Sequence, residues 1–326
     1  MEQRALGSTG LSVSALGFGC GAVGGLMVKG DPAEQRQAVT RALDAGITYF
    51  DTAALYGDGA SEEHLGRVMR ELDAWSRVVV GTKVRLPAVE PSEVSKAVRG
   101  SLESSLKRLG RSDVDVFHLH NPVVLSRPER GWLELSSVLD EVARALQEMK
   151  EAGLAKHIGF TGLGESAALR EVAMSEPYET MQTYFNVLNP SAGYIGHSGG
   201  QQDFEGLIDT AARAGVGVIV IRVLAAGAAA GQSERSGNAG DPGGRMAGGT
   251  YAADLTRADR VAQLSAELGL EGPVEMALRF GLAKPGVSTV LVGYSNLDHL
   301  EQAIRFAERG ALPESAVRRV LELSSE

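Results

Sequence analysis

Residues Ile47–Val84, ITYFDTAALYGDGASEEHLGRVMRELDAWSRVVVGTKV, contain one complete pattern of strand, helix and strand. The short runs Ile47–Phe50 and Val78–Val84 are rich in Val, Ile and aromatic residues, which is typical of buried strands. Between them, Ser61–Leu72 begins with a residue type that caps helices and carries apolar side chains at helical spacing. Two strands joined through a helix are expected to run parallel in one sheet.

The same pattern continues on both sides of this unit. The other predicted strands are Ala15–Gly19, Val114–Leu119, His157–Thr161, Thr180–Tyr184, Val216–Ile221 and Val287–Val292. The other predicted helices are Ala33–Ala45, Pro91–Leu109, Glu134–Glu151, Glu165–Met174, Asp203–Ala214, Ala258–Leu268, Asn296–Glu308 and an extra terminal helix, Pro313–Leu323. Eight strands alternating with helices predict an α/β fold, a closed (β/α)8 TIM barrel that spans residues 1–326 as one domain.

An open doubly wound sheet is the structural alternative. The run FGCGAVGG (Phe18–Gly25) places Gly19, Gly21 and Gly24 in the G-x-G-x-x-G spacing of dinucleotide-binding turns. No acidic residue follows with the expected spacing at the end of a second strand, so the pattern favours the barrel.

Composition limits the partners and the compartment. The 326 residues carry a formal net charge of -9 and no cluster of Lys or Arg, which argues against nucleic acid and against an anionic membrane surface. Cys20 is the only cysteine, so neither a disulfide nor a cysteine zinc site forms within the chain. No apolar segment has membrane-spanning length and the first residues are polar, so we expect a cytoplasmic protein. The oligomeric state is not indicated.

The segment 224–250, LAAGAAAGQSERSGNAGDPGGRMAGGT, departs from this rhythm because it is rich in Gly, Ala and Ser. It follows the seventh predicted strand, at the face of a barrel where active sites are built. It is either a flexible surface insertion or a loop that closes over a ligand.

Four polar residues lie at or just after predicted strand ends, namely Asp51, Tyr56, Lys83 and His120. Lys83 interrupts the apolar run VVVGTKV, and a buried ammonium needs a partner, for which Asp51 on the neighbouring strand is suited. A nearby ammonium is expected to lower the pKa of a tyrosine from its ordinary value of about 10. Tyr56 would then exchange a proton with a carbonyl oxygen, while His120 orients that carbonyl or helps pass the proton.

Together these residues resemble a known family. The motifs FDTAALYGDGASEEHLG (Phe50–Gly66), GTKV (Gly81–Val84) and LHNP (Leu119–Pro122) look like those of the aldo-keto reductases, in their bacterial branch of sugar and aldehyde dehydrogenases. The likeness runs from RALGSTGLSVSALGFG, similar to the family's N-terminal hairpin, to ALRFGLAKPGVSTVLVG near the end. It implies a catalytic set of Asp51, Tyr56, Lys83 and His120, with His118 as a competitor for the last place.

The resemblance also implies NADP(H) or NAD(H) across the barrel mouth and no metal. The positions it assigns to the cofactor are Gly21, Asp51, Thr161, Gln182, Ile221, Arg222, Leu224, Gly227, Gly293, Ser295, His299 and Gln302. Ile221 stands where the family usually has a stacking aromatic, so an aliphatic contact or the Arg222 guanidinium replaces it. Segment 224–250 matches the family's cofactor clasp.

The adenosine end leaves the choice of cofactor open. NADPH-specific members carry Lys or Arg after the last strand, where this chain has Gly293, Ser295 and His299. A 2′-phosphate prefers a cation, so their absence favours NADH, while the family's general habit favours NADPH.

The resulting function is hydride transfer between nicotinamide and a small carbonyl or alcohol: an aldehyde, a ketone or a sugar, in either direction. The alternative is a non-catalytic nicotinamide-binding regulatory subunit of the same fold, such as the family's channel-associated subunits. A metal-dependent hydrolase is disfavoured because only His120 and Asp51 are well placed as ligands. Phe18, Met27 and Trp132 are candidates for the pocket wall, with core or surface packing as the alternative.

Overall fold

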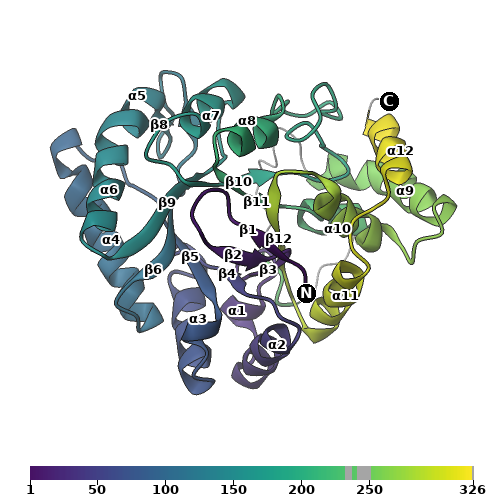
Figure 1. Cartoon of the computed structure of the whole chain (residues 1–326), viewed down its shortest axis with the longest axis horizontal. Helices are drawn as coiled ribbons and strands as arrows, with labels where there is room; N and C mark the ends of the chain where they lie inside the picture. Colours follow the sequence, from purple (N-terminus) through teal and green to yellow (C-terminus); the bar gives the residue numbers. More distant parts are fainter. Residues whose placement is uncertain (232–236, 241–250, 325–326) are drawn as a thin grey trace.

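Eight parallel strands close into a barrel in the computed structural model, which describes residues 1–231, 237–240 and 251–324 (Figure 1). Around the barrel the order is β3, β4, β5, β6, β9, β10, β11 and β12. The strands span Leu16–Gly19, Tyr49–Asp51, Val79–Val84, Val114–Leu119, Ala155–Thr161, Thr180–Tyr184, Gly217–Ile221 and Val287–Gly293 in that order. The predicted TIM barrel is therefore confirmed, with each predicted strand within two residues of the observed one.

Helices cover the outside of the barrel (Figure 1). The main ones are α2 (Pro32–Asp44), α3 (Ala60–Glu71), α4 (Val94–Leu109), α6 (Ala143–Glu151), α7 (Ser166–Ala173), α8 (Leu207–Arg213), α9 (Tyr251–Glu267), α10 (Pro273–Ala283), α11 (Leu297–Glu308) and α12 (Glu314–Ser324). Helix α2 shows why they begin where they do: Asp31 accepts a hydrogen bond from the Ala33 amide over 2.8 Å, and Pro32 is the first helical residue.

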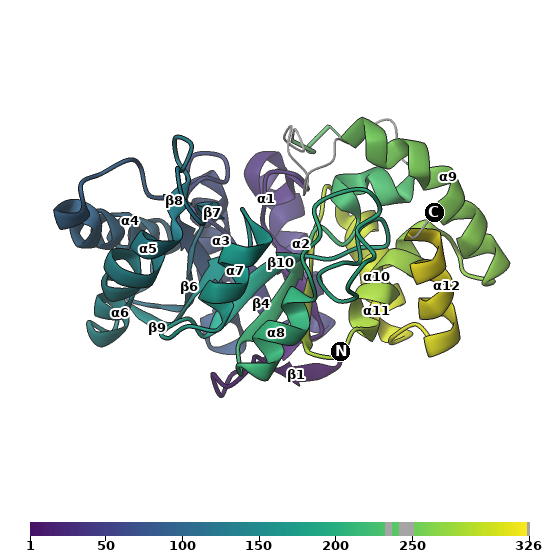
Figure 2. The same ribbon diagram turned by 90° about the horizontal axis from the view of Figure 1, so that it is seen from above.

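The hairpin of β1 (Gln3–Ala5) and β2 (Ser12–Ser14) lies at the end of the barrel where the strands begin (Figure 2). Arg4 donates to the carbonyl of Val287 at the start of β12, over 3.2 Å. Leu6 and Val13 are fully buried and join the inner core with Val116 and Ile219. The hairpin therefore leaves the opposite end of the barrel, where the strands end, accessible to a ligand.

Several elements differ from the predicted ones. The helix predicted over Asp203–Ala214 begins only at Leu207, because Gly206 adopts a left-handed conformation with φ of 69°. The predicted helix Glu134–Glu151 is broken into α5 (Leu135–Ser137), a π-helical turn over Val138–Val142 and α6. Helix α9 begins earlier than predicted, and α10 was not predicted at all.

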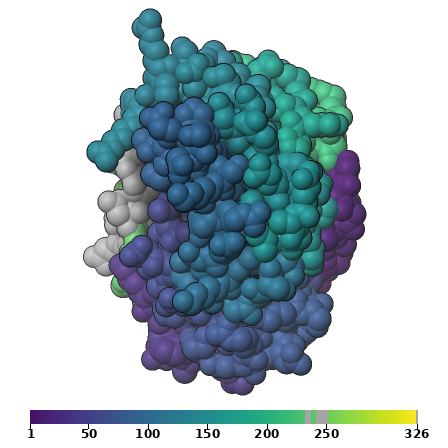
Figure 3. Space-filling view, turned by 90° about the vertical axis from the view of Figure 1, so that its left-hand side faces the viewer, coloured from purple at the N-terminus to yellow at the C-terminus, as the bar shows by residue number. Residues whose placement is uncertain are grey.

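Two loops at the C-terminal face contain short elements of their own. Strands β7 (Val123–Val124) and β8 (Leu133–Glu134) pair after β6, and the exposed segment 125–130 between them projects from the surface (Figure 3). Helix α1 (Leu26–Lys29) follows β3. The Gly/Ala-rich loop, residues 224–250, follows β11 and begins with a kinked 3-10 segment, Ala225–Ala230.

Candidate active site

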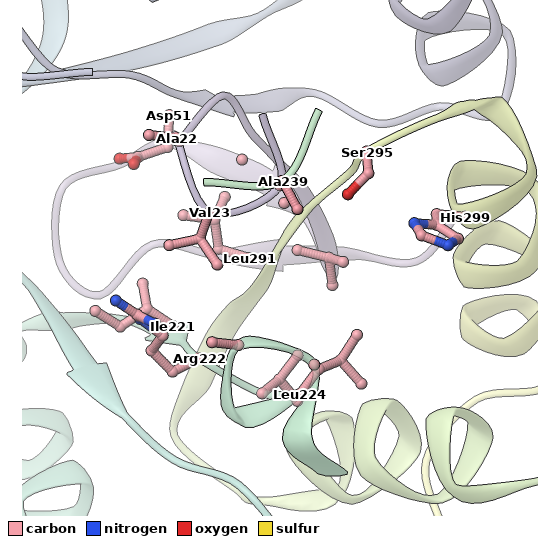
Figure 4. A pocket seen from close by; sticks show the side chains of 18 of the residues that line it. Ala22, Val23, Asp51, Ile221, Arg222, Leu224, Ala239, Leu291, Ser295 and His299 are labelled. Atoms are coloured by element: carbon pink, nitrogen blue, oxygen red, sulfur yellow. The ribbon is translucent and has the colours of Figure 1, made fainter. Parts of the chain in front are cut away.

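A cavity of about 360 Å³ opens at the C-terminal ends of the barrel strands (Figure 4). Every residue that the sequence analysis assigned to the cofactor lines this cavity, and so do Tyr56 and His120. Lys83 lies beneath the wall, with 1% of its surface exposed. The predicted residues therefore converge on one place, as the ends of parallel barrel strands allow.

A buried ammonium lies at the base of the site. Lys83 Nζ donates hydrogen bonds to Asp51 Oδ1, to the carbonyl of Thr52 over 2.8 Å and to the hydroxyl of Tyr56 over 3.2 Å. The pairing of β4 with β5 brings these residues together, because Asp51 lies opposite Gly81, two residues before Lys83. The predicted pairing of Asp51 with Lys83 is present.

Both members of this ion pair are held in a dry environment. Burial alone would lower the pKa of Lys83, but Asp51 and Tyr56 together raise it above its ordinary value, so the side chain stays protonated. Burial raises the pKa of Asp51, and the Lys83 ammonium opposes that rise. The hydrogen bonds that Asp51 accepts favour its ionised form.

The prediction for Tyr56 is wrong in one respect. Its pKa is raised above the ordinary value rather than lowered, because burial outweighs the opposing charge of Lys83. Asp51 adds to the rise, and Arg222 adds to the opposition. At neutral pH Tyr56 is therefore a protonated hydroxyl beside an ammonium, which is the form of a proton donor.

His120 and His118 have different environments. His120 lines the cavity, and its ring meets that of Tyr56 edge-on, with 5.9 Å between centroids. Burial, with repulsion from Lys83, holds the pKa of His120 well below 6.5, so its ring is neutral. This favours a hydrogen-bonding role over proton transfer. His118 lies deeper, 2.8 Å from Thr180 Oγ1, and burial lowers its pKa to about 3.

The residues assigned to the nicotinamide present amide-binding groups side by side. Thr161 and Gln182 are paired across β9 and β10. Within the described residues, Thr161 Oγ1 is buried without a hydrogen-bond partner, while Gln182 Nε2 donates to Asp51 Oδ2 over 2.5 Å. An unsatisfied hydroxyl beside a side-chain amide is suited to a carboxamide ligand, so these residues fit a nicotinamide.

Residues 237–240 of the Gly/Ala-rich loop lie across the cavity, while residues 232–236 and 241–250 of that loop lie outside the described residues. These four residues are held at both sides: Gly240 N donates to Ala22 O over 2.8 Å, and Asn238 Nδ2 donates to Ser295 O over 2.9 Å. Figure 4 shows Ala239 between the loop after β3 and Ser295. The loop therefore bridges the segments that follow β3 and β12.

The backbone at the start of this loop has unusual left-handed conformations. Ala225 and Ala226 have positive φ values of 45° and 59°, and Arg222, at the end of β11, has 59°. Non-glycine residues rarely adopt such angles, and they are concentrated at ligand-binding sites. Leu224 and Gly227 line the cavity at this turn.

At the far end of the cavity the wall contains Ser295, His299 and Gln302. Burial lowers the pKa of His299 below its ordinary value, with partial opposition from Asp298, so the ring is uncharged at neutral pH. Among the described lining residues, Arg222 is the only Lys or Arg. Arg235 and Arg245, further along the Gly/Ala-rich loop, lie outside the described residues.

Sequence analysis missed much of the cavity wall. The missed lining residues include Ala22, Val23, Leu163, Tyr184, Tyr251, Val274 and Leu278. Small and apolar side chains of this kind carry no local motif, so only the fold gathers them. Phe18 and Met27 belong to the core instead, and Trp132 is absent from the wall.

Two general properties of the described residues bear on the class of protein. No cluster of three His, Cys, Asp or Glu side chains among them is arranged to hold a metal ion. None of the helices that the structure describes has the length and apolar character needed to cross a membrane.

Fold and site together define a (β/α)8-barrel protein with a buried Asp–Lys pair and a tyrosine at the mouth of the barrel. The chain belongs to the aldo/keto reductase family, whose model matches residues 15–325. At the level of this family, the chain is related to oxidoreductases that act on carbonyl compounds and sugars.

Individual relatives have low sequence identity to this chain, but the matches cover most of both proteins. L-galactose dehydrogenase from Arabidopsis thaliana is 28% identical over 313 residues, which cover 93% of this chain and 87% of that protein. A putative voltage-gated potassium channel subunit beta from Schizosaccharomyces pombe is 28% identical over 333 residues, covering 94% and 88%. The holo structure of aldo-keto reductase AKR11C1 from Bacillus halodurans matches with a TM-score of 0.76 at 22% identity, over 99% of this chain and 96% of that one, which supports the fold.

Proposed function

We propose that this protein transfers hydride between NAD(P)(H) and a small carbonyl or alcohol, with Tyr56 as the residue that gives or takes the proton. The observation that carries the proposal is the hydrogen bond from Lys83 Nζ to the Tyr56 hydroxyl, at the wall of the cavity and backed by Asp51. A protein that only binds a nicotinamide does not need this proton-transfer arrangement. Burying the charge pair costs desolvation free energy, so its presence favours a catalytic role.

The chemistry follows from the positions of these groups. The bound nicotinamide would supply the hydride. Tyr56 donates its proton to the carbonyl oxygen, and the resulting tyrosinate is stabilised by the Lys83 ammonium. His120, neutral and open to the cavity, donates a hydrogen bond that fixes the direction of the carbonyl. Asp51 keeps Lys83 charged and oriented.

The raised pKa of Tyr56 gives the two directions of the reaction different pH dependences. Reduction needs the hydroxyl form, which predominates at neutral pH, whereas oxidation of an alcohol needs tyrosinate. We therefore propose that neutral pH favours the proton-donating step of reduction and that oxidation speeds up as the pH rises.

The same proposal assigns the cofactor to the cavity. Gln182 and Thr161 take the nicotinamide carboxamide, Ile221 or Arg222 covers its ring, and Gly21 lets it approach Tyr56, whose ring lies 3.6 Å from where a Cβ on Gly21 would be. Leu224 and Gly227 take the diphosphate, and segment 224–250 acts as the clasp. The adenosine lies at Gly293, Ser295, His299 and Gln302.

One relative supports a second candidate. The Schizosaccharomyces pombe protein is named as a potassium channel subunit, so a regulatory nicotinamide-binding role is the alternative. Absorbance at the nicotinamide band decides between the two, using NADH and NADPH with aldehydes and ketones, and NAD and NADP with aldoses that include L-galactose. Turnover supports the oxidoreductase. Cofactor binding without turnover of any substrate, in either direction, contradicts it.

A further inference from the structure

Gln182 lies at a junction between the cofactor cavity and the buried ion pair. It comes from β10, on the far side of the barrel from β4, yet its Nε2 donates to Asp51 Oδ2 over 2.5 Å, across 131 residues of sequence. Each of these two residues is 1% exposed. Asp51 is therefore shared: one oxygen accepts from Lys83 and the other from Gln182.

This contact fixes the orientation of the glutamine amide. An ionised carboxylate only accepts hydrogen bonds, so the NH2 group of Gln182 must face Asp51 and its Oε1 must face away. Gln182 also lines the cavity. An amide oxygen on that wall is an acceptor suited to an N–H donor of a bound ligand, and the nicotinamide carboxamide carries such donors.

We propose that Gln182 is a positioning residue that couples nicotinamide binding to the proton-transfer group, by accepting a hydrogen bond from the carboxamide while it donates one to Asp51. The inference rests on the proposed function, since it assumes that a nicotinamide is bound in this cavity. It adds a physical link: the side chain that holds the cofactor also holds the carboxylate that keeps Lys83 charged beside Tyr56.

The energetic consequence concerns the ionisation of Asp51. Burial raises its pKa, and the groups that oppose this rise are Lys83 from β5, Gln182 from β10 and Tyr49 from its own strand. Replacing Gln182 by a residue without a donor removes one of them, so Asp51 takes up a proton at a higher pH. Lys83 then loses its counter-charge and with it the ionic partner that orients the ammonium towards Tyr56.

Other charged and titratable groups near Asp51 do not produce the same effect. Cys20 is buried next to it and has a raised pKa, so it stays a neutral thiol. His118 and His120 are neutral because burial lowers the pKa of each. Arg222 acts on Tyr56, where its charge opposes the rise in pKa.

The test measures the dissociation constant of NADH by quenching of protein fluorescence at a series of pH values from neutral to acid, because the raised pKa of Asp51 moves its protonation towards neutral pH. NADH is the probe because it lacks the 2′-phosphate that a protonated His299 would attract. Wild type should bind NADH more weakly as the pH falls, because protonated Asp51 accepts a weaker hydrogen bond and holds Gln182 less firmly. In Gln182→Met this pH dependence should disappear. Thr161→Val is the matched control: it removes a cavity hydroxyl on the adjacent strand without touching Asp51, so it should weaken binding at every pH and keep the slope.

A second measurement uses turnover at saturating cofactor. Gln182→Met should lower kcat by about ten- to a hundredfold, which is the range of one hydrogen bond to a charged group, and should move the acid limb of the pH profile upward. Gln182→Glu, which keeps the shape and places a like charge beside Asp51, should move that limb further upward. Thr161→Val should leave the limb unchanged.

The outcomes separate this inference from the proposed function. If Gln182→Met and Gln182→Glu weaken binding yet keep the wild-type pH slope and the wild-type acid limb, Gln182 only binds the cofactor and the coupling is wrong. If wild type binds cofactor with the expected slope but turns over no substrate, the coupling stands and the proposed oxidoreductase activity fails.

Discussion

Lys83 Nζ donates a hydrogen bond to the hydroxyl oxygen of Tyr56 over 3.2 Å, and this contact fixes which way the tyrosine can act. Because the oxygen accepts from the ammonium, the hydroxyl hydrogen is free to point towards the cavity that Tyr56 lines. The tyrosine is therefore arranged to give its proton to a ligand rather than to its neighbour.

Tyr56→Phe should abolish nearly all turnover, by about a hundred- to ten-thousandfold, which is the usual contribution of general acid–base catalysis. Cofactor affinity should change little, because the hydroxyl contributes chiefly in the transition state. Steady-state kinetics with fluorescence titration of the cofactor checks both. Tyr184→Phe, at another tyrosine of the same wall, is the control and should keep most of its activity. Wild-type turnover in Tyr56→Phe rules out the assignment.

Lys83→Met should move the pH profile of alcohol oxidation upward. Burial already raises the pKa of Tyr56, and Lys83 opposes that rise, so its removal raises the pKa further and tyrosinate forms only at higher pH. Asp51→Asn should shift the profile less, since it acts through Lys83. The profiles are measured at saturating substrate. Identical curves for wild type and Lys83→Met contradict the coupling.

The sequence predicted the parts of this site that are close to strand ends. The position of Lys83 in an apolar run was sufficient to predict a buried ammonium paired with Asp51, and the pairing of β4 with β5 produces that contact. It did not predict the sign of the pKa shift of Tyr56, because the depth of burial depends on the complete wall of the cavity.

Contacts between residues far apart in the chain could not be predicted from the sequence for a similar reason. The bond between Gln182 and Asp51 joins two strands on opposite sides of the closed barrel, and no local pattern specifies which rotamers meet there. Predicted helix boundaries were wrong where the left-handed conformation of a glycine ends the helical pattern, as at Gly206 before α8. The crossing of residues 237–240 over the cavity likewise depends on the backbones of two other loops.

Gly25→Ala should loosen the clasp. Gly25 has a φ of +86°, and a Cβ there would lie 1.7 Å from Asn238 O, so the loop cannot keep its present position against Ala22 and Ser295. The rate of cofactor release, followed by stopped-flow fluorescence, should rise. Asn238→Ala removes the side-chain hydrogen bond to Ser295 without introducing a clash and should have a smaller effect in the same direction. Unchanged release in Gly25→Ala means that the loop does not retain the cofactor.

The last prediction concerns the choice between NADH and NADPH. Among the described residues at the adenosine end, Gly293, Ser295 and His299 offer no cation, because the lowered pKa of His299 leaves its ring neutral at pH 7. A 2′-phosphate there lacks a charge-assisted hydrogen bond, which is typically worth about 1.5–3 kcal/mol. NADH should therefore bind at least comparably to NADPH, and His299→Arg should shift the preference towards NADPH. Dissociation constants for both cofactors, in wild type and variant, check this. Because partial burial lowers the pKa of His299, its ring gains a proton only in acid, so lowering the pH should favour NADPH in wild type and leave His299→Arg unaffected. A preference for NADPH above about a hundredfold in wild type at pH 7, near 2.7 kcal/mol, contradicts the prediction and requires a cation elsewhere in the chain, for which Arg235 and Arg245 would be the first substitutions to make.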